Sequence, residues 1–440
     1  MMEYVHVAIQ DKIFEERNIK VTGRALASIY EWADNKRFAL TGIPYPQRKQ
    51  ALITYLKKVQ ALNGKRYIDS GGYSIINGSV PFRGIEEFIG FYLDFLENEV
   101  DLYDYIFSLD IPWGFNDDRL QNKQIIYALN YRVLHQSLQI IKKNPIIRNK
   151  FLFIYHFKMP GQLEIWNKLY EELELAKHIT HRAIGGLVGV KGKNRRIDFT
   201  VFISMIFRVF WDYYQAGDFI AELKIHLLGV YLPKERFAIA VCEKILNRFA
   251  KKQGLSTNIT LTYDTMDFAY DSWYSAKETF FWSYTGYQLD RYLYHSVPSN
   301  ILNQVYGQAL SHVQVEINRL NSGKRMKNAD AFIPLSIYSQ IQLDKLFMHV
   351  TDHYQIADVI DTKNTRNPNV VMPKKDITQL KDTIQYDFRK FPNLFPEQIE
   401  RDLLMMAGFS HWLFYDQDLS RLETTTRTFI KLIDFPDSLK

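Results

Sequence analysis

Short apolar runs recur along the first 265 residues, and longer segments with helical periodicity separate them. Runs that are apolar at consecutive positions, rather than at alternate ones, are typical of strands buried on both faces of a sheet. Eight runs are predicted to be strands: residues 6–9, 38–43, 66–70, 105–112, 151–157, 182–188, 224–231 and 258–265.

Segments with apolar residues at helical spacing fill the intervals between these strands. They cover residues 46–64, 84–99, 117–143, 161–179, 199–214 and 233–254. Strand and helix in repeated alternation indicate a parallel sheet with helical crossovers. A doubly wound sheet has this alternation too, but eight strands within 265 residues favour an α/β fold of the (β/α)8 TIM-barrel type.

The character of the chain changes near residue 275. We therefore predict a barrel over residues 1–275 and a mostly α-helical C-terminal region over residues 276–440. The aromatic-rich segment 273–294 has two interpretations, which are stacking of single-stranded bases and packing against the barrel. A role for the C-terminal region in nucleic-acid docking rests on its position alone.

Composition adds few constraints. The chain has 440 residues, 47% hydrophobic and 24% charged, and its net charge of +6 permits a polyanionic partner without requiring one. The single cysteine, Cys242, excludes an intrachain disulfide and a zinc site built from several cysteines. Neither a signal peptide nor a membrane-spanning run is present, so we expect no membrane partner and a cytoplasmic protein, in the host cytoplasm if phage-encoded. Dimerisation is left open.

Polar residues and glycines follow the ends of the predicted strands. They are Asp69, Asp110, His156, Gly185, Gly186, Gly229 and Asp264. Each has an ordinary structural explanation: an Asx turn at Asp69, a strand-end cap at Asp110, a satisfied core histidine at His156. In a (β/α)8 barrel, however, catalytic residues lie at the carboxyl ends of the strands, and three acids there favour an active site.

Metal binding and glycosidic-bond chemistry both use several carboxylates in one place. No H-x-H or H-x-x-E ligand spacing accompanies these acids, so no metal and no cofactor is expected. In glycosidic-bond chemistry one carboxylate attacks the anomeric carbon and another transfers the proton of the leaving group.

Five motifs in order along residues 60–275 resemble those of the tRNA-guanine transglycosylase superfamily. They are "DSGGYS" (69–74), "SLDIP" (108–112), "AIGGLVG" (183–189), "HLLGV" (226–230) and "TYDTMDFAYDS" (262–272). No single motif is specific, whereas the ordered set is. The resemblance implies a barrel enzyme that cuts the bond between guanine and ribose and installs a 7-deazaguanine base.

The resemblance also implies a role for each matching residue. Asp264 would be the nucleophile and Asp69 the acid/base, while Asp110 would accept hydrogen bonds from the N1–H and N2–H edge of guanine. The remaining substrate-binding residues would be Ser70, Gly71, Gly72, Tyr73, His156, Gly185, Gly186, Leu228 and Gly229. Tyr73 and Leu228 would enclose the ring, and the glycines would let the backbone approach a flat base.

Several departures from the family pattern bear on the substrate. The family's zinc-binding cysteines are absent, His156 stands where Gln is usual, and Ser74 replaces the Gln of the first motif. Because the zinc region supports RNA contacts in tRNA-modifying members, its loss favours the phage and bacterial branch that acts on DNA. We therefore predict DNA-guanine transglycosylation. The same exchange on tRNA or another RNA, and a non-catalytic nucleic-acid-binding subunit, remain the alternatives.

A basic run follows the third motif. Its cations, Lys191, Lys193, Arg195 and Arg196, have two interpretations, which are a solvated loop and a contact with the phosphates of the flipped nucleotide. The second interpretation predicts that exchange falls steeply with salt.

Overall fold

The structure is a computed structural model of the whole chain. It describes residues 2–8, 14–32, 45–76, 78–112, 118–156, 160–186, 199–230, 232–265, 280–285, 288–360, 374–389, 394 and 399–429. All structural statements below concern these residues.

Eight strands form a closed barrel in sequence order, as the periodicity predicts. They are β1 (Glu3–Val7), β2 (Arg24–Ser28), β3 (Lys65–Asp69), β4 (Tyr105–Phe107), β5 (Phe151–His156), β6 (His181–Gly185), β7 (Glu222–Leu228) and β8 (Asn258–Thr265). Neighbouring strands pair in parallel, with Ser28 opposite Asp69 and His156 opposite Gly185. The fold is therefore a (β/α)8 barrel, and the carboxyl ends of its strands share one rim.

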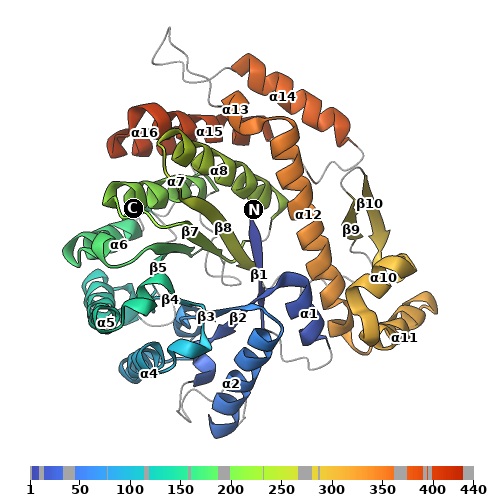
Figure 1. Cartoon of the computed structure of the whole chain (residues 1–440), viewed down its shortest axis with the longest axis horizontal. Coiled ribbons are helices and arrows are strands. Elements are labelled where there is room, and N and C mark those ends of the chain that lie inside the picture. The colour runs from blue at the N-terminus through green and yellow to red at the C-terminus, as the bar shows by residue number, and fades with distance from the viewer. Residues whose placement is uncertain are drawn as a thin grey trace. The chain divides into compact units, whose positions relative to one another are not determined.

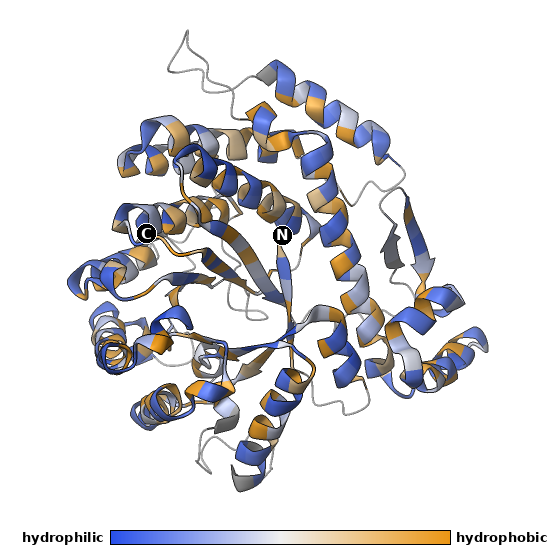
Figure 2. Ribbon diagram, in the orientation of Figure 1, coloured by the Kyte–Doolittle hydropathy of each residue, from blue (hydrophilic) through white to orange (hydrophobic). Residues whose placement is uncertain are grey.

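Helices connect the strands. They are α1 (Glu15–Thr22), α2 (Tyr45–Ala61), α3 (Gly72–Ile76), α4 (Ile85–Asn98), α5 (Lys123–Lys143), α6 (Pro160–Glu172), α7 (Phe199–Ala216) and α8 (Pro233–Lys252). Figure 2 shows polar and apolar faces along these helices, the pattern that predicts a helix covering a sheet.

The second barrel strand lies outside the segment that the apolar pattern predicts. Residues 38–43, where it was expected, lie outside the described residues, and the structure forms β2 from Arg24–Ser28 instead. Its sequence, "RALAS", is short and contains two alanines with low β propensity, so the apolar pattern is faint. Helix α1, which precedes it and ends at Gly23 with a left-handed φ of 65°, was not predicted either.

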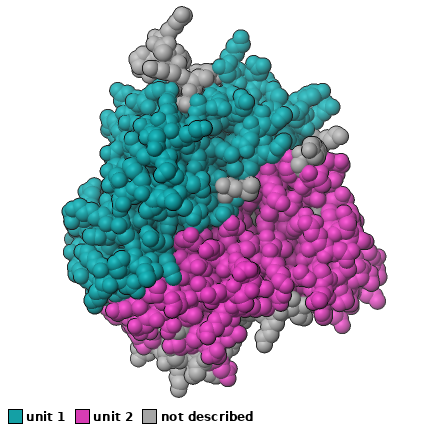
Figure 3. All heavy atoms as spheres, viewed as in Figure 1, with its two compact units in different colours: residues 1–3, 110–262, 347–440 teal, residues 4–109, 263–346 magenta. Residues whose placement is uncertain are grey.

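The described residues divide into two compact units, coloured separately in Figure 3. Unit 1 comprises residues 1–3, 110–262 and 347–440, and unit 2 comprises residues 4–109 and 263–346. Each unit therefore contains barrel strands together with part of the region after residue 275.

After the barrel, unit 2 continues with a hairpin and helices. They are β9 (Phe280–Tyr284), β10 (Leu289–Leu293), α10 (Ser299–Tyr306), α11 (Leu310–Asn321) and α12 (Ile333–His353), whose last turns belong to unit 1. Figure 1 shows the hairpin, α10 and α11 beside α12. Tyr294 packs with Phe332 and other apolar residues into a cluster that also includes Phe14, the residue before α1.

Unit 1 ends with helices that cover the barrel helices. They are α13 (Ile356–Ile360), α14 (Lys374–Asp387), α15 (Ile399–His411) and α16 (Leu419–Phe429). Helix α7 is apolar over most of its surface because α15 lies on its outer side, where Phe207 stacks on Phe409 with ring centroids 5.6 Å apart. Every described helix is too short or too polar to span a membrane.

Candidate functional site

Alternation along the strands decides which side chains face the barrel interior. On β5, Tyr155 hydrogen-bonds Asp212 of α7 and Phe153 packs on Trp166 of α6, so these two side chains face the helices. Because successive side chains point to opposite faces of a strand, His156 faces the interior at the end of β5. On β6, Arg182 hydrogen-bonds Tyr170 of α6 and therefore faces the helices, and Ile184 shares this face. Gly185, the next residue, lies on the interior face.

Asp110 and His156 form the closest pair in the candidate site. His156 Nδ1 lies 2.5 Å from Asp110 Oδ2, and both side chains are almost fully buried. The other ring nitrogen, His156 Nε2, is buried and has no hydrogen-bond partner among the described residues. A buried polar atom without a partner is unfavourable unless a ligand or water satisfies it. The imidazole is therefore anchored on one side and free to bind on the other.

Asn130 of α5 holds the backbone beside Asp110. Its Oδ1 accepts from the Ile111 N–H at 2.8 Å, and its Nδ2 donates to the Ile111 carbonyl at 2.9 Å and to the Ile126 carbonyl at 2.8 Å. Asn130 is fully buried, so these bonds fix the irregular segment that follows β4. Sequence reasoning missed this residue, because a polar position in the middle of a long helix carries no motif.

Gly185 leaves room for the His156 ring. A Cβ at this position would lie 3.1 Å from His156 Nδ1, the atom that contacts Asp110. The next residue, Gly186, has a φ of 86°, and Gly229 after β7 has a φ of 83°, so both adopt the left-handed conformation that glycine tolerates best. Leu228, the last residue of β7, is half-buried.

In unit 2, the loop after β3 requires a glycine at position 71. Asp69 ends β3 and is half-buried, and Ser70 is fully buried. Gly71 has a φ of 84°, and a Cβ there would lie 2.7 Å from Phe88 Cζ. Packing against α4 therefore accounts for this glycine by itself, beside its expected role in base binding.

The same loop exposes an aromatic ring. Gly72 begins the short helix α3, and Tyr73 follows it with 52% of its surface exposed. An exposed tyrosine four residues after a strand-end acid is available for stacking on a planar ligand. Its side chain is thus accessible, as the expected role requires.

Asp264 lies on β8, also in unit 2, and is 9% exposed. The preceding residue, Tyr263, donates its hydroxyl to Asp344 Oδ2 of α12 at 2.7 Å, and its ring lies 5.4 Å from that of Tyr4. Since Tyr263 faces α12, Asp264 faces the barrel interior. Tyr4 also donates to the Thr265 carbonyl at 3.4 Å, so Asp264 sits between two anchored neighbours.

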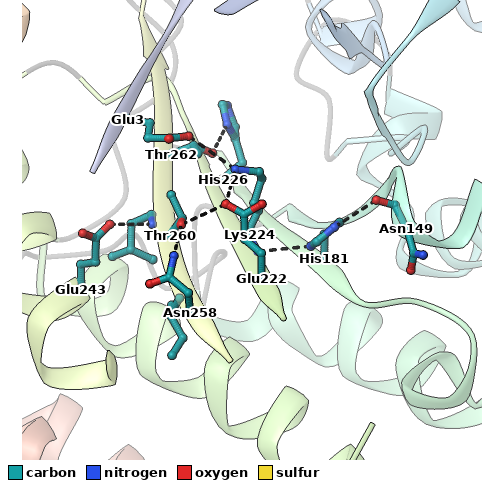
Figure 4. Close-up of polar contacts among 12 residues, drawn as sticks. Glu3, Asn149, His181, Glu222, Lys224, His226, Glu243, Asn258, Thr260 and Thr262 are labelled. Atoms are coloured by element: carbon teal, nitrogen blue, oxygen red, sulfur yellow. Dashed lines mark hydrogen bonds and ion pairs between the residues drawn. The ribbon is translucent and has the colours of Figure 1, made fainter. Parts of the chain in front are cut away.

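Deeper in unit 1, polar contacts run from the amino-terminal ends of the strands to His226 and Thr262, which lie just past the strand midpoints (Figure 4). Lys224 Nζ contacts Glu222 at 3.0 Å and Glu3 at 3.4 Å, and His226 Nδ1 lies 2.7 Å from Thr262 Oγ1. These charges are paired and lie away from the carboxyl ends, where barrel residues contribute to stability rather than to chemistry. These contacts are structural.

The remaining predictions for the site divide as follows. Lys191, Lys193, Arg195 and Arg196 lie outside the described residues. Asp110, His156 and Gly185 belong to unit 1 and are in contact, whereas Asp69, Tyr73 and Asp264 belong to unit 2. Within the described ranges, no group of three or more His, Cys, Asp or Glu side chains is arranged to hold a metal ion.

No family model and no curated protein matches this chain. Among solved structures, a family 1 β-glucosidase from Thermotoga maritima is similar over 56% of this chain and 75% of its own, with 9% identity and a TM-score of 0.30. An endo-1,4-β-xylanase from Caldicellulosiruptor owensensis is similar over 60% and 84%, with 12% identity and a TM-score of 0.34. A probable tagatose 6-phosphate kinase from Sinorhizobium meliloti is similar over 97% and 100%, with 9% identity and a TM-score of 0.35.

These values are too low to carry an argument about function. The class of the protein follows instead from its own topology, which is a closed (β/α)8 barrel with additional helices. Characterised enzymes with this fold place their active sites at the carboxyl ends of the strands, where the residues described above are found.

Proposed function

We propose that this chain is a glycosyltransferase that exchanges guanine in DNA for a 7-deazaguanine base. One observation supports the proposal above all others. Asp69, Asp110, His156 and Asp264 each stand at or just beyond the carboxyl end of a strand in one closed barrel. These are the positions, in the same order, at which the resembling family has its acids and its base-recognising side chain.

The proposed reaction has two displacements. The Asp264 carboxylate attacks C1′ of the target nucleotide, the C1′–N9 bond breaks, and the electron pair leaves with guanine, which takes a proton from Asp69. The incoming base then loses its N9 proton to Asp69 and attacks C1′, and the bond to Asp264 breaks. One base leaves and one enters, so no oxidant, reductant or further reactant is consumed.

Asp110 and His156 would recognise the purine as one unit. The contact with Asp110 fixes the imidazole, which leaves Nε2 to bond the base. Gly185 and Gly186 would keep the backbone close to the base, with Tyr73 and Leu228 on its faces. A base must leave the duplex stack to reach such a site, so the enzyme acts on a flipped or single-stranded nucleotide.

DNA is proposed rather than RNA because the chain has one cysteine and lacks the zinc-binding cysteines of the tRNA-modifying members. The deciding experiment offers the purified protein DNA and RNA of the same sequence together with a radiolabelled 7-deazaguanine base. We expect label in DNA. Label only in RNA would favour the alternative substrate.

Variants test the catalytic assignment in the same assay. Asp264→Asn should abolish incorporation, whereas Asp382→Asn, which changes an exposed acid on α14, should not. Incorporation by Asp264→Asn at the normal rate would refute the mechanism. Absence of incorporation by the unmodified protein, together with nucleic-acid binding, would indicate the non-catalytic alternative.

A further inference from the structure

Unit 2 contains a polar cavity of about 610 Å³ outside the barrel. The hairpin β9–β10, helix α10 and helix α12 line it, with Tyr284, Tyr292, Gln304, Tyr338, Gln342 and Lys345 among the lining residues. The volume is within the range of small-ligand sites in proteins.

The walls of the cavity are fixed to one another. The Trp282 N–H donates to Ser339 Oγ at 2.9 Å, and the Tyr294 and Ser336 hydroxyls lie 2.6 Å apart, so the hairpin and the segment after it are attached to α12. Tyr338, Gln342 and Lys345 occur at positions i, i+4 and i+7 of α12 and therefore form one stripe along the helix. The cavity is thus a formed site rather than a gap between mobile loops.

Gln342 is the lining side chain that most directly indicates a ligand. It is 3% exposed and lines the cavity, yet its amide has no hydrogen bond to any described residue. The amide lines the cavity wall, and a donor and an acceptor on one planar group suit the edge of a nucleobase. The amide therefore provides a place where a base edge would bind.

The other lining groups fit the rest of a nucleotide. Three tyrosine rings offer stacking surfaces, and Lys345 is exposed with no ion pair among the described residues. The acid in the cavity, Asp290, accepts from Gln288 Nε2 at 2.5 Å and is engaged in that bond. A bond from a neutral amide leaves Asp290 charged, so the lining carries one anion and one cation. Lys345 is the group that a phosphate would contact.

We infer that this cavity binds one nucleotide of a single-stranded segment of the substrate, other than the nucleotide that undergoes exchange. The inference rests on the proposed function, which supplies the polymer. A physical link to β8 also exists, because Asp344 on α12 lies between Gln342 and Lys345 and holds Tyr263 beside Asp264. An occupied cavity would stabilise the helix that anchors the proposed nucleophile's strand.

The test measures binding without chemistry. The full-length protein is titrated into a fluorescein-labelled oligothymidylate of 12 nucleotides, which contains no guanine to exchange, and into the matching oligouridylate. Gln342→Met and Lys345→Gln should each weaken binding several-fold, and Lys345→Gln should reduce the slope of log Kd against log salt by about 0.7. The control Lys324→Gln removes an exposed lysine of the same unit that does not line the cavity and should leave binding unchanged.

A second readout locates the contact. Ultraviolet cross-linking of an oligonucleotide containing 4-thiothymidine should label peptides that contain Tyr284, Tyr292 or Tyr338. Unchanged affinity of both cavity variants, or labelling confined to other peptides, would overturn the inference while guanine exchange could still proceed. If binding depends on the cavity but no exchange occurs on any polymer, the inference stands and the proposed function fails.

Discussion

In the proposed site, the contact between Asp110 and His156 would provide a base-recognition group that differs from a lone carboxylate. One oxygen of Asp110 is committed to the imidazole at 2.5 Å, and the free Nε2 extends the pair toward a ligand. Under the proposed function, the aspartate would act partly through the histidine. Replacement of a Gln by a His at this position, which the sequence alone presents as a departure, is consistent with a neighbouring acid that orients the ring.

The pair can be tested by a double-mutant cycle. Asp110→Asn and His156→Leu should each lower kcat/KM for base exchange by up to about 100-fold, since a misplaced recognition group costs this much. The double variant should be little worse than either single variant, because the two residues act as one unit. Fully additive losses would show that each residue binds the base independently.

A substitution at Gly185 distinguishes an effect on the proposed site from an effect on folding. Gly185→Ala places a methyl group 3.1 Å from His156 Nδ1 and should displace the ring, so exchange should fall at least tenfold while the midpoint of urea unfolding changes little. The control Gly90→Ala lies on the exposed face of α4 with nothing within 4 Å of the new Cβ. It should stabilise the protein by about 1 kcal/mol without affecting exchange. Normal exchange by Gly185→Ala would contradict the role of the ring.

His181 predicts how stability depends on pH. Its Nδ1 accepts from the Lys224 N–H at 3.2 Å, so its Nε2–H donates to the Asn149 carbonyl at 3.1 Å. Burial first, and then the nearby Lys224 charge, lower the pKa of His181 to about 4. In the unfolded chain the pKa of His181 is near 6.5, so the unfolded state binds this proton at a higher pH than the folded state does. The stability that the folded protein gains from a neutral His181 is therefore complete above pH 6.5 and is lost progressively toward pH 4.

Urea unfolding at several pH values measures this effect. Between pH 7 and pH 5 the free energy of unfolding should fall by about 2 kcal/mol on account of His181. The variant His181→Gln should lack this part of the pH dependence. An identical pH profile for the variant would show that the imidazole is not kept neutral in the folded protein.

A buried hydrogen bond joins strand β8 to helix α12. The Tyr263 hydroxyl and the buried Asp344 carboxylate form the bond that attaches the proposed nucleophile's strand to a helix after the barrel. A hydrogen bond to a charged group contributes about 1.5–3 kcal/mol. Tyr263→Phe leaves the carboxylate buried without this donor, so it should destabilise the protein by that amount and lower kcat more than it changes KM.

Asp344→Asn provides the matched variant, because its amide oxygen can still accept from Tyr263. It should retain most of the stability and of kcat that Tyr263→Phe loses. Stability is measured by urea unfolding and kcat by steady-state exchange. Equal losses in both variants would show that the hydrogen bond accepted from Tyr263 does not account for the contribution of residue 344.

Element by element, the apolar runs predicted the strands well where the strands are long and rich in β-branched or aromatic residues. The predicted ranges at 151–157, 224–231 and 258–265 match β5, β7 and β8 within three residues at either end. The pattern fails for β2, since "RALAS" offers only two alanines and one leucine to mark its faces. Tertiary pairing with β3 defines that strand, and no local signal reports it.

For the whole molecule, the barrel and the strand-end residues could be predicted from sequence, because strand alternation and short motifs are local. The support around them could not. Asn130, Tyr4 and Asp344 hold the segments that carry Asp110 and Asp264, yet each comes from a distant element with no motif of its own. The boundary expected near residue 275 also has no counterpart in the two compact units, which each combine segments from both sides of it.

The central claim is that Asp264 becomes covalently bonded to the target sugar. The direct measurement is mass analysis of the protein after incubation with a guanine-containing oligonucleotide and acid quench, in the absence of an incoming base. We predict a covalent protein–oligonucleotide complex whose modified peptide contains Asp264 and which Asp264→Asn does not form. A complex attached through another residue, or exchange that proceeds with no covalent complex under any quench, would contradict the account.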